Sequence, residues 1–307
     1  MTLTELRYII AVAREKHFGK AAQLCFVSQP TLSVAVRKLE ETLGIDIFER
    51  AKNEIRLTPI GEKIVAQAQR VLDEVTIIKS LAKQGQDELT GPLRIGAIYT
   101  IGPYLFPYII PRLHELAPQM PLIIEENFTA VLRERLSNGQ LDVIIISLPF
   151  TGGGLQTISL YTEEFLILLP SEHRLAKYKA ISAEKLNDEN MMLLGEGHCF
   201  REQVLSACPG CVQPPSDAIA DIVEGSSLET IRHMVATGMG ITVVPQLAST
   251  QPYYHPNVLL TRPFTNPVPV RQVALAWRKS FPRPKVLSII QQAIQSCGLQ
   301  GVKFEPM

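Results

Sequence analysis

Residues 21–44 read AAQLCFVSQPTLSVAVRKLEETLG, and this stretch predicts two helices separated by a tight break at residues 25–27. Ser28 is a favourable N-cap for the second helix, and Pro30 lies in its first turn, where a missing N–H costs little. Gly44 ends that helix. Its inner face consists of apolar residues at helical spacing: Leu32, Val36, Leu39 and Leu43. The pattern is that of a helix-turn-helix, whose second helix fits a DNA major groove.

The outward face of the second helix carries hydrogen-bonding and cationic side chains: Gln29, Thr31, Ser33, Arg37 and Lys38. Side chains of these types read base edges in a major groove. Residues 47–57 then predict a β-hairpin, or wing, with the cations Arg50, Lys52 and Arg56. On the residues alone, a solvated helix pair with an ordinary hairpin explains the pattern as well as a DNA-binding head does.

A denser set of motifs separates these two interpretations: Ala21-Ala22, Val27 to Ser33, Leu39-Glu40, Leu43-Gly44, Phe48-Glu49-Arg50 and Leu57 to Gly61. Together they resemble the N-terminal domain of LysR-type transcriptional regulators. The resemblance implies a winged helix-turn-helix over residues 1–58 that binds double-stranded promoter DNA. It implies groove contacts from Gln29, Pro30, Thr31, Ser33 and Arg37, and contacts to phosphate or the minor groove from Arg50 and Lys52. It also implies a dimer of dimers that works with RNA polymerase.

Residues 59–90 predict a linker helix and a hinge. Thr58 and Pro59 suit the N-cap and first position of a helix. Its apolar residues step by four and three in turn: Ile64, Ala68, Val71, Val75, Ile78 and Ala82. Such a heptad seam favours a coiled coil between two subunits, although a helix packed on its own domain is the alternative. Residues 85–92, GQDELTGP, break the pattern and predict the hinge.

Residues 91–307 predict an α/β domain. Strand-like segments (93–98, 122–125, 143–147, 165–169 and 241–244) alternate with helical ones (104–116, 131–138 and 228–236). The length favours two subdomains around a cleft. The LysR-type resemblance implies a sensing domain like the periplasmic binding proteins, with subdomain I at 91–163 and 267–307 and subdomain II at 164–266.

Composition narrows the classes further. The chain has 307 residues, with 30 basic and 30 acidic side chains. The resulting net charge of zero argues against a broad basic surface, but it does not show where the charged residues lie. Residues 16–56 hold seven basic and five acidic residues, so a DNA surface there would consist of a few placed cations. No apolar run reaches the roughly 18–20 residues of a membrane span, and the N-terminus does not resemble a secretory signal. We therefore expect a cytoplasmic protein with no membrane partner.

Three of the five cysteines cluster: Cys199, Cys208 and Cys211. Cys199 has the surroundings of an activated thiol, because Arg201, a protonated His198 and a helix N-terminus would each favour the thiolate. The thiolate is the form that peroxide oxidises. If residues 200–208 are helical, Cys199 and Cys208 lie about 13 Å apart along the axis. A disulfide needs Cα atoms within about 7 Å, so bonding would require this segment to unwind.

The segment 195–211 is similar to the peroxide-sensing branch of the LysR-type family. Further similar segments are 97–107, 125–129, 224–234 and 274–278. This resemblance implies Cys199 as the thiol that peroxide oxidises and Cys208 as its disulfide partner. It implies a peroxide pocket formed by Thr100, Thr129, His198 and Arg271. It also implies a regulator of the oxidative-stress response rather than an enzyme.

Alternatives remain open from the residues. Cys208-Pro209-Gly210-Cys211 could instead supply half of a zinc site with His198 and Cys199, or Cys211 could compete as the disulfide partner. We expect no metal, because adjacent His198 and Cys199 suit one tetrahedral ion poorly. We also expect no cofactor. A LysR-type regulator that senses a small organic effector in the cleft is the alternative function. A thiol peroxidase is a third hypothesis, which the helix-turn-helix disfavours.

Overall fold

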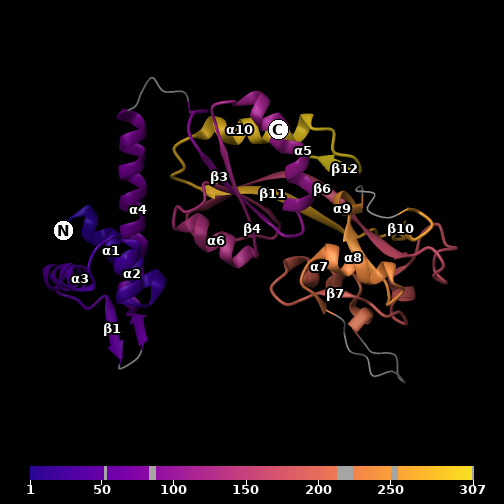
Figure 1. The fold of residues 1–307 in the computed structure, drawn as a ribbon, viewed down its shortest axis with the longest axis horizontal. Helices are drawn as coiled ribbons and strands as arrows, with labels where there is room; N and C mark the ends of the chain where they lie inside the picture. Colours follow the sequence, from indigo (N-terminus) through magenta and orange to yellow (C-terminus); the bar gives the residue numbers. More distant parts are fainter. Residues whose placement is uncertain (52–53, 83–87, 213–223, 250–254, 306–307) are drawn as a thin grey trace. The chain divides into compact units, whose positions relative to one another are not determined.

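The computed structural model describes residues 1–307 except 52–53, 83–87, 213–223, 250–254 and 306–307 (Figure 1). The chain divides into two compact units. The first, the N-terminal unit, holds residues 1–86 with 280–282. The second, the sensing unit, holds residues 87–279 with 283–307. None of the helices in the described part of the chain is long and apolar enough to cross a membrane.

The N-terminal unit is a winged helix-turn-helix followed by a long helix. Its elements are α1 (Leu3–Glu15), α2 (Phe18–Leu24), α3 (Gln29–Leu43), β1 (Phe48–Ala51), β2 (Glu54–Leu57) and α4 (Pro59–Ala82). The predicted caps of α3 are confirmed: the Ser28 side chain accepts from the Thr31 N–H, and Gly44 ends the helix with a φ of 68°. β1 and β2 pair as the antiparallel wing.

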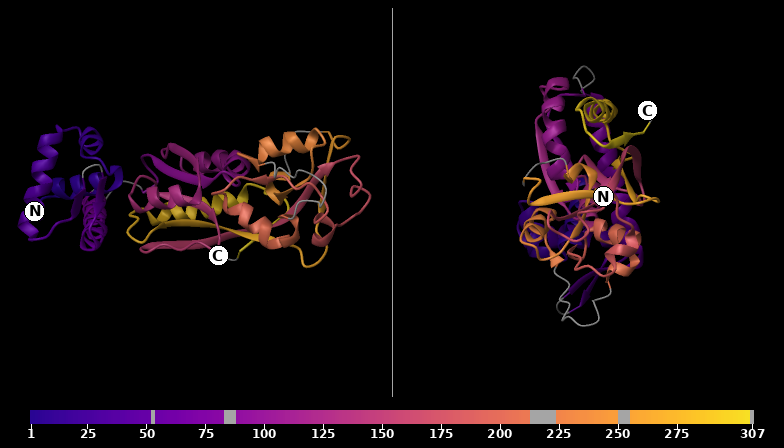
Figure 2. Two further views of the ribbon diagram at one scale, coloured as in Figure 1. Left: turned by 90° about the horizontal axis from the view of Figure 1, so that it is seen from below. Right: turned by 90° about the vertical axis from the view of Figure 1, so that its right-hand side faces the viewer.

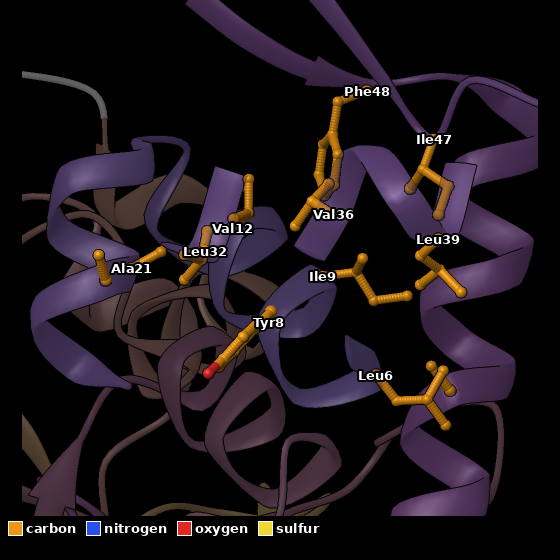
Figure 3. Packing of buried hydrophobic residues seen from close by; sticks show 12 residues of the cluster. Leu6, Tyr8, Ile9, Val12, Ala21, Leu32, Val36, Leu39, Ile47 and Phe48 are labelled. Atoms are coloured by element: carbon orange, nitrogen blue, oxygen red, sulfur yellow. The ribbon is translucent and has the colours of Figure 1, made fainter. Parts of the chain in front are cut away.

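Buried side chains from α1, α2 and α3, from the entry to the wing and from α4 form the core of this unit (Figure 3). Its members are Leu6, Tyr8, Ile9, Val12, Ala21, Ala22, Leu32, Val36, Leu39, Ile47, Phe48 and Ala68. The first part of the predicted α4 seam, Ile64, Ala68 and Val71, packs against this core. In that part, α4 packs on its own domain, which was the alternative to a coiled coil between subunits. Ile78, further along, is exposed, and pairing there between subunits stays a prediction.

Glu40 connects the reading helix to the wing. This buried carboxylate accepts from the backbone N–H groups of Ile47 (2.9 Å) and Phe48 (3.1 Å). On the other side, the Ile47 carbonyl accepts from the backbone N–H of Thr58 at 3.0 Å. A Cβ at Gly61 would lie 2.1 Å from that same carbonyl oxygen, so the first turn of α4 can approach only because residue 61 is glycine. One peptide therefore joins α3, the wing and α4.

The sensing unit is built on a mixed sheet with strand order β10-β6-β11-β5-β3-β4. Its helices are α5 (Gly102–Leu116), α6 (Thr129–Ser137), α7 (Cys199–Ala207), α8 (Leu228–Ala236), α9 (Gln246–Ser249) and α10 (Pro284–Ser296). Its strands are β3 (Leu93–Ile98), β4 (Leu122–Asn127), β5 (Val143–Ser147), β6 (Leu155–Pro170), β7 (Leu193–Leu194), β8 (Glu224–Gly225), β9 (Thr242–Pro245), β10 (Leu259–Pro263), β11 (Val270–Arg278) and β12 (Val302–Phe304). The short 3-10 helices are η1 (Ala183–Leu186) and η2 (Pro209–Val212). The predicted α/β alternation is confirmed.

The long strand β6 is the main difference from the predicted elements, which placed a strand only at 165–169. Its first part pairs with β11 and its last part with β9 and β10, and both long strands can be followed in Figure 2. The strand is continuous because both halves find partners, which a local pattern does not reveal. The subdomain boundaries proposed from the sequence stay a prediction.

Candidate functional site

The outward residues of α3 form a candidate nucleic-acid interface. Gln29, Pro30, Thr31 and Arg37 are exposed and Ser33 is half-buried. The Thr31 hydroxyl lies 2.7 Å from the Ser28 hydroxyl, so the helix cap holds its orientation. Arg50 lies in β1, and Lys52 falls outside the described residues.

Two exposed apolar side chains, one on this face and one in the turn before α3, were absent from the predicted set. Val34 is 67% exposed, and Phe26, in the turn before α3, is 95% exposed with a φ of 55°. Val34 stands three residues after Thr31 and four before Lys38, so helical spacing alone could have placed it on the same face. An apolar side chain at that position can contact a thymine methyl group.

In the sensing unit, the ends of two parallel strands meet the N-terminus of α7. Thr100 follows β3, and Thr129 follows β4 as the first residue of α6. His198 is the N-cap of α7 and Cys199 is its first residue. Parallel neighbours end at the same sheet edge, which brings Thr100 and Thr129 together although 29 positions separate them in the sequence.

These residues surround a cavity of about 10 Å³. Its lining consists of Ile98, Tyr99, Thr100, Asn127, Phe128, Thr129, Gly197, His198 and Cys199. A volume of this size holds one molecule about as large as water. The cavity therefore unites four predicted site residues around space for a very small polar molecule.

Two hydroxyl groups of the lining have hydrogen-bonding capacity that points to a ligand. The Thr129 Oγ1 is buried and has no hydrogen-bond partner among the described residues. The Thr100 Oγ1 accepts from Arg271 at 2.9 Å, which leaves the Thr100 hydroxyl proton to be donated elsewhere. An orphaned buried hydroxyl costs about 1–3 kcal/mol, and a small polar guest would satisfy it.

His198 is a neutral wall of this cavity. Its ring packs against Phe128 at 4.8 Å and Tyr99 at 5.8 Å between centroids. Burial lowers the pKa of His198, and a hydrogen bond to the Ser226 backbone opposes this only in part. A depressed pKa keeps the imidazole uncharged at neutral pH, so the predicted help of a protonated His198 to a Cys199 thiolate is not supported.

Arg271 lies behind Thr100 and is not among the residues that line the cavity. It donates to both the hydroxyl (2.9 Å) and the carbonyl oxygen (2.8 Å) of Thr100, a residue that does line the cavity. The pocket role predicted for it is therefore indirect in this geometry. Arg201, the other predicted cation, donates to the Leu194 carbonyl at 2.7 Å.

Helix α7 keeps the two predicted redox cysteines apart. Cys199 begins the helix with a half-buried free thiol, and Cys208 is buried at its C-cap. Nine residues at 1.5 Å rise correspond to about 13 Å. Cys211 lies in η2, and its side chain is outside the described residues. Among the described residues, no group of three or more His, Cys, Asp or Glu side chains could hold a metal ion.

Comparison with known proteins places both units in one family. Residues 3–62 match the model described as "Bacterial regulatory helix-turn-helix protein, lysR family", and residues 86–298 match the "LysR substrate binding domain". The DNA-binding transcriptional dual regulator OxyR of Escherichia coli K12 is 35% identical over 296 residues, covering 96% of this chain and 95% of that protein.

Two solved structures extend the match. A full-length OxyR C199D variant from Pseudomonas aeruginosa is 53% identical with a TM-score of 0.82, covering 100% of this chain and 99% of that one. A hydrogen peroxide-bound mutant of Corynebacterium glutamicum OxyR is 32% identical with a TM-score of 0.61, covering 96% and 93%. The chain therefore belongs to the LysR family of bacterial regulatory helix-turn-helix proteins, within its OxyR group.

Proposed function

We propose that this protein is a DNA-binding transcriptional regulator of the oxidative-stress response, and that hydrogen peroxide switches it by oxidising Cys199 to a disulfide with Cys208. The observation that carries the proposal is the cavity of about 10 Å³ in which Cys199 meets Thr100, Thr129 and His198. Relatives across nearly the whole length are named hydrogen peroxide-inducible genes activators. The assignments of site residues come from the sequence and from this geometry.

In the first step, the Cys199 thiolate attacks one peroxide oxygen. An S–O bond forms and the O–O bond breaks, and the departing hydroxide takes a proton and leaves as water. The sulfur gives up two electrons and becomes a sulfenic acid. The hydroxyls of Thr100 and Thr129 hydrogen-bond the peroxide and stabilise charge on the departing oxygen. The N-terminus of α7 favours the negative thiolate.

In the second step, the Cys208 thiolate attacks the Cys199 sulfur. An S–S bond forms, the S–O bond breaks, and hydroxide leaves and is protonated to water. Two thiols and one peroxide thus give one disulfide and two waters. Because the ends of α7 stand about 13 Å apart, the disulfide cannot form while the helix is intact. Oxidation is therefore coupled to unwinding of α7.

The unwound segment repacks the sensing unit, and the change reaches promoter DNA through subunit packing. We propose a dimer of dimers, with Gln29, Pro30, Thr31, Ser33 and Arg37 at the groove. Arg50 and Lys52 contact the backbone or the minor groove. Several heads on one site compensate for the low charge of each head. RNA polymerase is the proposed partner at the promoter.

Peptide mapping after mild peroxide treatment tests the switch. We expect a Cys199–Cys208 disulfide in the wild type and a trapped Cys199 sulfenic acid in Cys208→Ser. The matched control, Cys211→Ser, should keep the disulfide. If both thiols stay free after peroxide, the switch is wrong. If a disulfide of Cys199 persists in Cys208→Ser and is lost only in Cys211→Ser, the partner is Cys211.

A regulator of a small organic effector is the alternative within the same family. The cavity at Cys199 is too small for such a molecule. Cys199→Ser separates the two functions. An effector sensor with this substitution would keep its response to its organic inducer, whereas a peroxide sensor would lose its response to peroxide.

A further inference from the structure

Glu163 is a buried carboxylate that the peroxide chemistry above does not use. It lies in β6, two residues before the strand begins to pair with β9. Its side chain is 0% exposed, and that of its partner Arg271, on the neighbouring strand β11, is 1% exposed. A fully buried ion pair is costly to desolvate and rarely adds net stability. Its presence beside the cavity therefore calls for a role other than folding.

The two carboxylate oxygens of Glu163 hold different parts of the sensing unit. Oε1 accepts from the Arg271 Nε at 2.9 Å and lies 2.8 Å from its Nη2. Oε2 accepts from the backbone N–H of Leu247, in α9, at 2.8 Å. The Glu163 carboxylate thus orients the Arg271 guanidinium through Oε1, and the Leu247 N–H holds the carboxylate in place through Oε2.

Arg271 passes this orientation to Thr100. Its Nη1 donates to the Thr100 hydroxyl oxygen and its Nη2 donates to the Thr100 carbonyl. A hydroxyl that accepts from a guanidinium must direct its own proton to another acceptor. Thr100 lines the cavity, so this arrangement favours donation of that proton to a molecule bound there.

The same guanidinium contacts the helix that carries Cys199. Its central carbon lies 5.2 Å from the ring centroid of Phe200, the second residue of α7. The Phe200 ring also packs edge-on against Phe165 of β6 at 5.0 Å. Arg271 therefore touches both walls of the reaction site, the hydroxyl donor and the first turn of α7.

We infer that Glu163 is a positioning residue of the peroxide site, acting through Arg271 to aim the Thr100 hydroxyl at peroxide bound beside Cys199. The inference rests on the proposed function. It explains why a charged pair is buried between the paired strands β6 and β11. It assigns the carboxylate no contact with peroxide or sulfur.

The test compares two reactions of Cys199 in the full-length reduced protein: oxidation by hydrogen peroxide and alkylation by iodoacetamide. Alkylation displaces iodide from carbon and needs no hydroxyl donor, so it reports thiol access and reactivity alone. In Glu163→Asp and Glu163→Gln, we expect the ratio of peroxide rate to iodoacetamide rate to fall about tenfold. Glu164→Gln, which removes the neighbouring carboxylate of the same strand, should keep the ratio within about twofold.

A double-mutant cycle with Thr100→Val shows whether the effect passes through Thr100. We expect Glu163→Asp to change the ratio by less than about twofold in that background. An unchanged ratio of the two rates in Glu163→Asp overturns the inference. Equal falls in the peroxide and iodoacetamide rates would also overturn it. So would a fall in the ratio that is as large in the Thr100→Val background as in the wild type. Glu163→Asp keeps the charge and decides the matter if Glu163→Gln does not fold. If wild-type Cys199 does not react with peroxide, the proposed function itself fails and the inference fails with it.

Discussion

Replacing Glu40 by glutamine probes how the reading helix holds the wing. Glutamine keeps an oxygen near the N–H groups of Ile47 and Phe48 but removes its negative charge. A hydrogen bond to a charged group contributes about 1.5–3 kcal/mol, and a neutral one about 0.5–1.5. With two such bonds at 2.9 and 3.1 Å, the loss is about 2 kcal/mol. Glu40→Ala, which leaves both N–H groups buried without this acceptor, should cost about 3–5 kcal/mol.

Hydrogen exchange of the full-length protein, read by mass spectrometry at peptides containing residues 47 and 48, measures this loss. A change of 2 kcal/mol corresponds to about 30-fold faster exchange when opening is the equilibrium step. Glu41→Gln is the matched control, because Glu41 is exposed on the same helix and carries the same charge. It should leave exchange at both positions unchanged. Unaltered exchange in Glu40→Gln, or equal acceleration in Glu41→Gln, would refute the local role of the carboxylate.

Three further outcomes follow from other contacts. Ser28→Ala removes the N-cap of α3 and should cost about 0.5–2 kcal/mol, seen as faster amide exchange in the first turn of that helix, whereas Ser28→Asn should restore protection. Tyr104→Phe removes the 2.6 Å hydrogen bond from the Tyr104 hydroxyl to Glu229 and should lower the free energy of unfolding of the sensing unit by about 1–3 kcal/mol. Urea unfolding, followed by the fluorescence of Trp277, the one tryptophan of the chain, measures this loss. An unchanged urea midpoint would contradict the prediction. Burial lowers the pKa of His198, so the unfolded chain binds more protons than the folded one. The free energy of unfolding therefore falls as the pH drops through the ordinary histidine pKa of about 6.5. In His198→Gln, the same urea assay should show a weaker dependence of stability on pH, and an equally steep dependence would count against this assignment.

The sequence was most informative where structure depends on neighbours along the chain. Ser28, Pro30 and Gly44 act through caps and turns within a few residues, and each did what its local chemistry predicts. The strands at 93–98 and 143–147 and the helix at 228–236 agree with their predicted bounds, because apolar periodicity is itself a local property. The proximity of His198 and Cys199 likewise needed no fold to be seen.

Tertiary packing decided everything that joins distant segments. It turned Ile64 and Ala68 of the α4 seam toward the core of their own unit, a choice that heptad spacing alone leaves open. It brought Thr100 and Thr129 to the cavity through parallel strand ends, placed Arg271 behind Thr100 instead of on the cavity wall, and buried Glu163 against it. The physical reason is that a periodic pattern fixes which face of an element is buried, whereas the partner of a buried charge depends on which strands become neighbours.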